Sequence, residues 1–371
     1  MRPGPTSARL ILGVLPALPT VLAIAGTLVL FSIFPLLQGA SALDAIGLIF
    51  KGAFGSSFAW QSTLLRAAPL MLTALCVALP AQVGLVVIGG EGALALGGLS
   101  AAVVPQCLPA GTSWLIAIPL MGIASIIAGG LWIGAVGAMR QLRGVNETIS
   151  SLLMAYIAIA VFKHLVEGPL RDPASLNKPS TLPIPDALAI GSMPGLEMHW
   201  GLLWGVLACI AAWVFVRHST QGFAMRIVGG NHRAARLVGL PVSKLALGAC
   251  ALGGGAAGLA GMFEVAAVQG SANASLLAGY GYSGILVAFA ARQNPLAIIA
   301  CAIMIGGIEA SGSLLQRRLG LPDATTLVLQ GLLFANLLAW EALGGRMAAW
   351  RVALQAIAET ALPAQPEASH A

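Results

Sequence analysis

A few polar side chains interrupt the long apolar stretches of this sequence, and they are the residues best suited to chemistry. They are Glu91 in a glycine-rich run, Asn146 and Glu147 before an apolar segment, and Asn273, Tyr280 and Tyr282 further on. Ionisable groups inside a membrane are costly, and by default they suggest a functional site. Carboxylates, amides and phenols can hydrogen-bond a polar ligand, and tyrosine rings can stack on a flat one. These six residues therefore predict a translocation path or its gate.

Glu91, Asn146 and Glu147 each have two competing explanations. A carboxylate is favourable at a helix N-terminus, so Glu147 could simply begin a helix, with Thr148 and Ser150 as further capping groups. Alternatively, Asn146 and Glu147 brace an inner gate or a neighbouring cytoplasmic helix through one of three basic residues, Arg140, Arg143 or Arg236. For Glu91, bracing of a break in its helix competes with direct contact to a substrate.

The other polar residues of the apolar segments leave similar alternatives. Tyr280 and Tyr282, with Asn273 nearby, could stack on and hydrogen-bond a flat ligand such as a base. Tyrosines are equally common as anchors at the membrane interface. The remaining charged groups of these segments are expected to face water, the membrane surface or a structural partner: Arg66, Glu264 and Glu309.

Motifs of enzymes and nucleotide-binding proteins are absent from the sequence. There is no G-x-x-x-x-G-K-[ST] and no H-E-x-x-H motif. Residues 279–284 match G-x-G-x-x-G, but they lie in an apolar segment without a preceding strand, where that pattern has no nucleotide-binding meaning. The five cysteines are widely spaced and have no ligand spacing. We therefore predict no catalytic residue, no metal site and no enzymatic activity in this chain.

The composition identifies the class of protein that must position these groups. Of the 371 residues, 58% are hydrophobic and only 9% are charged, whereas soluble domains carry about 25% charged residues. The mean hydropathy is +0.90. The net charge of +6 indicates cytoplasmic loops rather than nucleic-acid binding, because Lys and Arg collect on the cytoplasmic side of membrane proteins. An all-α, polytopic membrane protein is predicted.

The apolar segments predict about ten spans within a single transmembrane domain that covers 1–371. The N-terminus and the tail 344–371 are then cytoplasmic, as is the basic loop 217–244, while the proline-rich loop 167–199 is extracytoplasmic. The spans together cover 10–343, and they are placed near 10–37, 63–87, 88–105, 113–138, 146–166, 200–216, 245–268, 278–291, 295–315 and 324–343.

Two of these spans are short and interrupted by glycine, at 84–98 and 279–288. They are third from the start and third from the end. Broken helices at corresponding positions of two halves point to a transport pathway, because unwound backbone inside a membrane is tolerated only where it faces protein or water. Two inverted halves are therefore possible, although the sequence shows no clear repeat.

The basic loop 217–244 contains a segment suited to docking. Asn231 is placed to cap a short helix that Gly239 and Pro241 end. Within it, Arg233 and Arg236 flank a small apolar patch made of Ala234, Ala235, Leu237 and Val238. Such a helix could bind a soluble partner, or the loop could serve only to set the topology.

Four stretches taken together carry a resemblance. "VGGNHRAARLVGLPVSK" resembles the cytoplasmic coupling loop of ABC-importer permeases of the simple-sugar, nucleoside and branched-chain amino-acid group. "GLVVIGGEGALALGG" and "GYSGILVAFAARQNP" resemble two further motifs of that group, and "GVNETISSLLMAYIA" is similar to its nucleoside-type branch. The resemblance runs from about residue 60 to about residue 340.

The sequence departs from the family pattern at several positions. Val87 stands where the family has Asn, Ala93 where it has Gln and Ala155 where it has Asn, and Ser283 replaces an Asp. The sequence therefore lacks four polar residues of the family motifs. A changed substrate is therefore a possible consequence.

The resemblance implies a permease subunit in a bacterial inner membrane that transports nucleosides. Simple sugars or branched-chain amino acids are alternative cargoes, and an ion-coupled secondary transporter is the rival from another class. The implied partners are ABC ATPase subunits, an extracytoplasmic substrate-binding protein, a second permease subunit and membrane lipid, but no nucleic acid. No cofactor is expected on this chain, since ATP and Mg would bind the ATPase. The implied ATPase-coupling residues are Arg226, Asn231, His232, Arg233, Ala235, Arg236 and Gly239.

Overall fold

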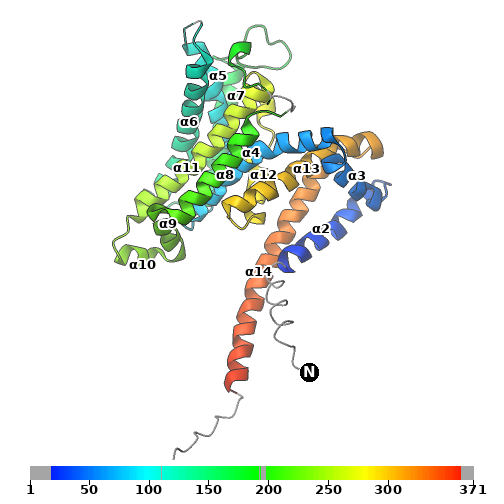
Figure 1. Cartoon of the computed structure of the whole chain (residues 1–371), viewed down its shortest axis with the longest axis vertical. Helices are drawn as coiled ribbons and strands as arrows, with labels where there is room; N and C mark the ends of the chain where they lie inside the picture. The colour runs from blue at the N-terminus through cyan, green and yellow to red at the C-terminus, as the bar shows by residue number, and fades with distance from the viewer. Residues whose placement is uncertain (1–17, 110, 192, 194–197, 361–371) are drawn as a thin grey trace, which may run out of the picture. The chain divides into compact units, whose positions relative to one another are not determined.

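The computed structural model describes residues 18–109, 111–191, 193 and 198–360, and it is built of helices (Figure 1). The all-α expectation is therefore confirmed. The α-helices are α2 (Leu18–Leu37), α3 (Ala42–Phe54), α4 (Ser57–Ala81), α5 (Gly90–Cys107), α6 (Trp114–Arg143), α7 (Glu147–Glu167), α8 (Gly201–His218), α9 (Thr220–Gly230), α10 (His232–Leu237), α11 (Val242–Phe263), α12 (Tyr280–Ala290), α13 (Pro295–Leu319) and α14 (Thr325–Thr360). A π-helical segment, η2 (Glu264–Gln269), continues α11, and short 3-10 turns lie at η1 (Asp186–Leu188) and η3 (Ala274–Leu276).

The chain divides into two compact units. One unit is formed by residues 45–326, and the other is formed by residues before 45 together with residues after 326. In the second unit α2 packs on α14, where a Cβ added to Gly26 would lie 3.1 Å from Asn336 Oδ1. Helix α14 continues to Thr360, into the segment expected as a tail. The first part of the predicted span 10–37, at residues 10–17, and the end of the predicted tail, at residues 361–371, lie outside the described part of the chain.

The span count is lower than expected. Among the described residues, six helices are long and apolar enough to cross a membrane, or seven if the bent pair α2 and α3 forms one span. Shorter apolar helices cover 274–290 and 325–340. The six long ones match the predicted spans at 63–87, 113–138, 146–166, 200–216, 245–268 and 295–315.

The two glycine-interrupted spans explain part of this difference. Helix α5 begins only at Gly90, after the irregular segment 85–89. Helix α12 has 11 residues, so it is about 16 Å long and covers roughly half of a bilayer core. Both regions are therefore broken, as the glycines indicate.

Small residues hold the 45–326 unit together from within. Helix α11 packs against α6 so closely that a Cβ on Gly254 or Gly258 would collide with the α6 backbone at Gly129 and Ser125. Several large apolar side chains of α6 point outward, among them Leu120, Ile123 and Ile127. Close backbone contacts inside and bulky apolar groups outside are typical of helices that pack within lipid.

The 45–326 unit has two distinct ends. Helices α9 and α10 lie at one end, and the loop 167–199 lies at the opposite end (Figure 1). The loop is tied to the segment that follows α11, because Thr181 N–H donates to the Ala272 carbonyl (3.0 Å) and Ile190 N–H donates to the Ala266 carbonyl (2.9 Å). The loop is therefore attached directly to the π-helical segment and its continuation.

Candidate functional site

Glu91 joins the two broken spans. Its carboxylate is buried, with only 1% of the residue exposed, and it accepts hydrogen bonds from the backbone N–H groups of Gly279 (2.9 Å) and Gly281 (2.6 Å). These amides belong to the start of α12, where a helix N-terminus favours negative charge. The structure therefore gives Glu91 the bracing role, and it reveals the partner, which the sequence did not indicate.

The same contact fixes Tyr280 in place. Its neighbours Gly279 and Gly281 donate to Glu91, while the Tyr280 carbonyl accepts from Thr73 Oγ1 of α4 (3.0 Å). A Cβ on Gly281 would collide with the Glu91 backbone, so only glycine fits there. The first turn of α12 is thus held from both α4 and α5.

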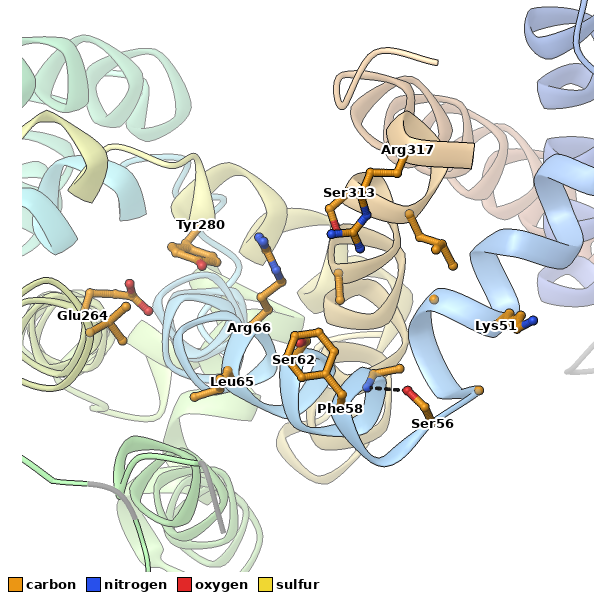
Figure 2. Close-up of a pocket in the computed structure, with 16 residues that line it drawn as sticks. Lys51, Ser56, Phe58, Ser62, Leu65, Arg66, Glu264, Tyr280, Ser313 and Arg317 are labelled. Atoms are coloured by element: carbon orange, nitrogen blue, oxygen red, sulfur yellow. Dashed lines mark hydrogen bonds between the residues drawn. The ribbon is translucent and has the colours of Figure 1, made fainter. Parts of the chain in front are cut away.

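The Tyr280 side chain lines a cavity of about 500 Å³ that has both polar and apolar groups on its wall (Figure 2). Arg66 of α4 and Glu264 at the start of the π-helical segment line it as well. A cavity of this size lies in the range that binds small molecules. The polar groups on its wall also include Lys51, Ser56, Ser62, Ser313 and Arg317.

Arg66 and Glu264 are functional candidates that the sequence analysis set aside. Arg66 lies nine positions into α4, about 14 Å along the helix, and this exposed residue lines the cavity. Glu264 is only 5% exposed, and the charges of Arg66 and Glu309 act on it. The two residues are 198 positions apart, so no local pattern could have paired them. The π-helical turn at Glu264, which often marks a functional site, was also invisible in the hydropathy pattern.

Asn273 and Tyr282 do not line this cavity. Asn273 caps η3, since its Oδ1 accepts from Ser275 N–H (2.9 Å), and its backbone pairs with Ser180 of the long loop. Tyr282 is 38% exposed, on the first turn of α12. Of the three residues predicted to contact a flat ligand, only Tyr280 lies in the cavity.

Asn146 and Glu147 lie at the junction of α6 and α7, away from the cavity. Asn146 caps α7 by accepting from Ile149 N–H (3.1 Å). Glu147 pairs with Arg140 of α6, with a distance of 3.2 Å between Oε2 and Nε. Capping and pairing with a basic residue, which the sequence posed as alternatives, thus occur together.

The same end of α7 braces the irregular segment before α5. Thr148 Oγ1 donates to the Val86 carbonyl (3.0 Å), and Ile88 N–H donates to Ser151 Oγ (2.9 Å). These bonds satisfy backbone groups that no helix can satisfy, which an apolar environment demands. Braces for the broken span therefore come from Thr148 and Ser151 rather than from Glu147.

The predicted docking helix is present as α10. Asn231 caps it, with Oδ1 accepting from the N–H groups of Arg233 (2.9 Å) and Ala234 (3.0 Å). Gly239 ends it with a φ of 80°, a left-handed value that suits glycine. Leu237 and Val238 are exposed, as are Arg233 and Arg236.

One coupling candidate points inward instead. Ala235 is fully buried, and it packs in a core cluster with Val83, Leu85 and Val228. The expected apolar patch is thus divided, because successive residues of one helical turn face different sides. Ala235 anchors α10 to the protein, while Leu237 and Val238 face outward. Arg226 of α9 is exposed and lies over the Phe223 ring, 6.0 Å from its centroid.

The α9–α10 pair contacts the turn that leads into the broken span. A Cβ on Gly229 would collide with the Gln82 carbonyl oxygen, and a Cβ on Gly84 would lie 3.3 Å from His232 Cε1. Gln82 Nε2 in turn donates to the Gln293 carbonyl at the end of α12 (3.1 Å). A continuous set of contacts therefore leads from α10 through 82–89 to α5, Glu91 and α12.

The positions at which the sequence departs from the family pattern lie away from the cavity. Val87, Ala93 and Ala155 are fully buried, and Ala155 packs against Gly92. Neither these three residues nor Ser283 lines the cavity. Among the described residues, no three His, Cys, Asp or Glu side chains gather as metal ligands.

Comparisons with known proteins agree with this architecture. Residues 60–338 match the family described as branched-chain amino acid transport system / permease component. The chain is 32% identical to a glucose ABC transporter permease protein of Haloferax volcanii, over 81% of this chain and 81% of that protein. It is 29% identical to a guanosine ABC transporter permease protein of Bacillus subtilis, over 78% of this chain and 83% of that protein. A ribose import permease protein of Escherichia coli is 29% identical over 44% of this chain and 49% of its own length.

Proposed function

The chain belongs to the permease component family of branched-chain amino acid transport systems, and on that premise we propose that its cargo is a nucleoside, with a simple sugar as the second candidate. As a permease subunit of an ABC importer, it is a multi-pass membrane protein without a catalytic site of its own. ATP and Mg would bind a partner ATPase, and no cofactor would bind this chain.

The polar groups of the cavity wall are the observation that supports this cargo. Acceptor, donor and hydroxyl groups from Glu264, Arg66 and three serines lie there with two aromatic rings, Phe58 and Tyr280. Nucleosides and sugars are neutral molecules with several hydroxyls, so they need such mixed hydrogen bonding. Relatives named for guanosine, glucose and ribose transport fit the same class.

A branched-chain amino acid is the competing cargo, because Arg66 and Glu264 could also receive its carboxylate and ammonium groups. Its aliphatic side chain would need an apolar pocket. The cavity wall carries apolar side chains such as Leu65 and Val268 as well, so we base the preference for hydroxyl-bearing cargo on the hydroxyl groups of the wall.

The proposed path has its outer mouth at the end that carries loop 167–199. A substrate-binding protein would deliver cargo there, and a second permease subunit, identical or related, would complete the path. The membrane would be a bacterial cytoplasmic membrane, with both termini inside.

We propose that α9 and α10 dock on the ATPase. Arg233, Arg236, Leu237 and Val238 form the exposed face that would bind it. Closure of two ATPase subunits on ATP would move α10, and the contacts at Gly229 and His232 would pass that motion to 82–89 and α5. Glu91 would then carry it to α12, which bears Tyr280.

Uptake measurements test this proposal. Cells that express the chain with its candidate partners receive labelled uridine or guanosine, with ribose, glucose and leucine as comparators, under ATP depletion or with a protonophore. We expect nucleoside uptake that stops without ATP and persists without the proton gradient. Uptake that stops only with the gradient would instead indicate an ion-coupled secondary transporter, and uptake of leucine alone would overturn the cargo class.

A further inference from the structure

We propose that the cavity beside Glu264 is a subsite that selects rings bearing adjacent hydroxyl groups. Such a ring is common to the ribose of a nucleoside and to a simple sugar. The proposal rests on the proposed function, and it adds which groups select the cargo: Glu264, Arg66 and Tyr280. The three side chains come from three separate elements and line one cavity (Figure 2).

Glu264 provides the acceptor for neighbouring hydroxyls. It opens the π-helical segment, and only 5% of the residue is exposed. A carboxyl group has two oxygens side by side, so it can form hydrogen bonds with two adjacent hydroxyl groups. Burying a polar group costs free energy unless hydrogen bonds compensate it. A cargo ring with two neighbouring hydroxyls therefore satisfies Glu264 better than a ring with one or none.

Arg66 provides complementary donors. Its guanidinium is a planar fork of five N–H groups, which suits ring and hydroxyl oxygens that lie side by side. The Arg66 charge acts on both Glu264 and Tyr280. Because one cation faces one carboxylate, the inner part of the subsite is suited to a neutral ring. Lys51 lies on the far side of the cavity from Glu264 (Figure 2).

Tyr280 provides a fixed aromatic surface. Its backbone is held on one side by Glu91 through Gly279 and Gly281 and on the other side by Thr73. A side chain on so constrained a turn loses little further freedom when cargo binds, which favours affinity. The ring can pack against the C–H face of a sugar while Glu264 and Arg66 bind its edge.

Competition of labelled uridine uptake tests the subsite in the full complex with its ATPase and binding protein. The competitors are uridine, 2′-deoxyuridine, 2′,3′-dideoxyuridine, ribose, uridine monophosphate and leucine. If glucose proves to be the cargo, labelled glucose with 2-deoxyglucose and 3-deoxyglucose takes their place. We compare the wild type with Glu264→Gln and Arg66→Leu, and with the matched controls Glu167→Gln and Arg318→Leu, which alter exposed residues outside the cavity.

We expect loss of both ribose hydroxyls to weaken competition by about tenfold or more in the wild type, because a site built for hydroxyls rejects analogues that lack them. Glu264→Gln should reduce that discrimination to about threefold or less, since an amide offers one acceptor oxygen in place of two. The same binding protein serves every variant. A change in discrimination between variants therefore belongs to the permease.

Several results separate the subsite from the proposed function. If wild-type complexes take up neither nucleoside nor sugar, the proposed function fails. Uptake of either one with unchanged discrimination in Glu264→Gln and Arg66→Leu overturns the subsite alone. Stronger competition by uridine monophosphate would assign the cavity to a phosphate near Lys51 and Arg317 and would also overturn it. ATP hydrolysis equal to that of the wild type shows that the variants are folded and assembled.

Discussion

The two ends of the 45–326 unit place their charged groups in different surroundings. At the α9–α10 end, Arg233 and Arg236 are exposed, and a buried alanine anchors the helix beneath them. At the other end, where the π-helical segment is bonded to the long loop, buried Glu264 lines a cavity together with Arg66, which is itself exposed. Outward charge suits a large protein partner, whereas charge around a cavity suits a small polar ligand. In the proposed function, this arrangement separates energy input from cargo binding.

Backbone contacts connect the two ends. Glycines at 84 and 229 allow α9 and α10 to meet the turn before α5, and Glu91, which does not line the cavity, joins α5 to α12. Packed cores transmit small displacements because they deform little. The central claim is therefore that a motion at α10 changes the cavity. The motion would pass through residues 82–89, although these residues do not line the cavity. Each prediction below breaks or sharpens this division.

Reversal of charge on α10 should have the largest effect. Arg233→Glu combined with Arg236→Glu should abolish ATPase association and uptake, because both side chains are exposed on the docking face and opposed charge across an interface is strongly unfavourable. Co-purification with the ATPase measures association. Lys244→Glu, an exposed charge reversal at the start of α11, is the control and should retain association. Normal association of the double variant would refute the docking role of α10.

Removal of the Glu91 carboxylate should have the second-largest effect. Glu91→Ala leaves two amides at the start of α12 without their acceptor, which costs on the order of 3 kcal/mol. We expect a lower unfolding temperature and little uptake, with Glu91→Gln between this variant and the wild type because it keeps one acceptor oxygen. Thermal unfolding in detergent measures the first effect. Unchanged stability of Glu91→Ala would show that α12 does not depend on this contact.

A methyl group at Gly229 should uncouple the ends without preventing docking. Gly229→Ala would drive a Cβ into the Gln82 carbonyl, and overpacking of this kind costs about 1–3 kcal/mol. We expect the ratio of cargo transported to ATP hydrolysed to fall while ATPase association persists. The matched control is Gly230→Ala, one position on, where nothing lies within 4 Å of an added Cβ. Equal ratios for the two variants would contradict the proposed connection.

The brace from α7 should have the smallest effect. Thr148→Val keeps the shape of the side chain but removes the hydrogen bond to the Val86 carbonyl, a loss of about 1 kcal/mol. A modest decrease in uptake is expected, measured beside Ser150→Ala, whose hydroxyl bonds only within α7. If both variants behave as the wild type, the segment 85–89 does not need this brace.

Local features of the sequence predicted the structure of the α9–α10 end well. The Asn231 cap, the α10 helix and its end at Gly239 follow from residues within nine positions of one another. The glycines of 84–98 and 279–288 likewise predicted broken helices. Capping and glycine conformations are local physics, so a sequence read in order contains them.

The cavity could not be predicted in the same way. Glu91 bonds to Gly279 and Gly281 across 188 and 190 positions, and only the fold brings Arg66 and Glu264 to the wall of one cavity. Hydropathy also overestimated the number of full-length spans, because it does not distinguish a half-length helix such as α12 from a full crossing. The inward direction of Ala235 depends on the core beneath α10, which no short motif encodes.

Accessibility of the cavity tests the central claim most directly. After Cys107, an exposed thiol, and Cys301, a partly exposed one, are replaced by Ser, Ser62→Cys places one accessible thiol on the cavity wall. A membrane-impermeant maleimide is applied from the proposed outer side to the complex, with and without ATP trapped on the ATPase. We expect the labelling rate to differ between the two states, and this difference to vanish in Gly229→Ala but not in Gly230→Ala. Equal labelling rates in both states of an assembled, active complex would contradict the account.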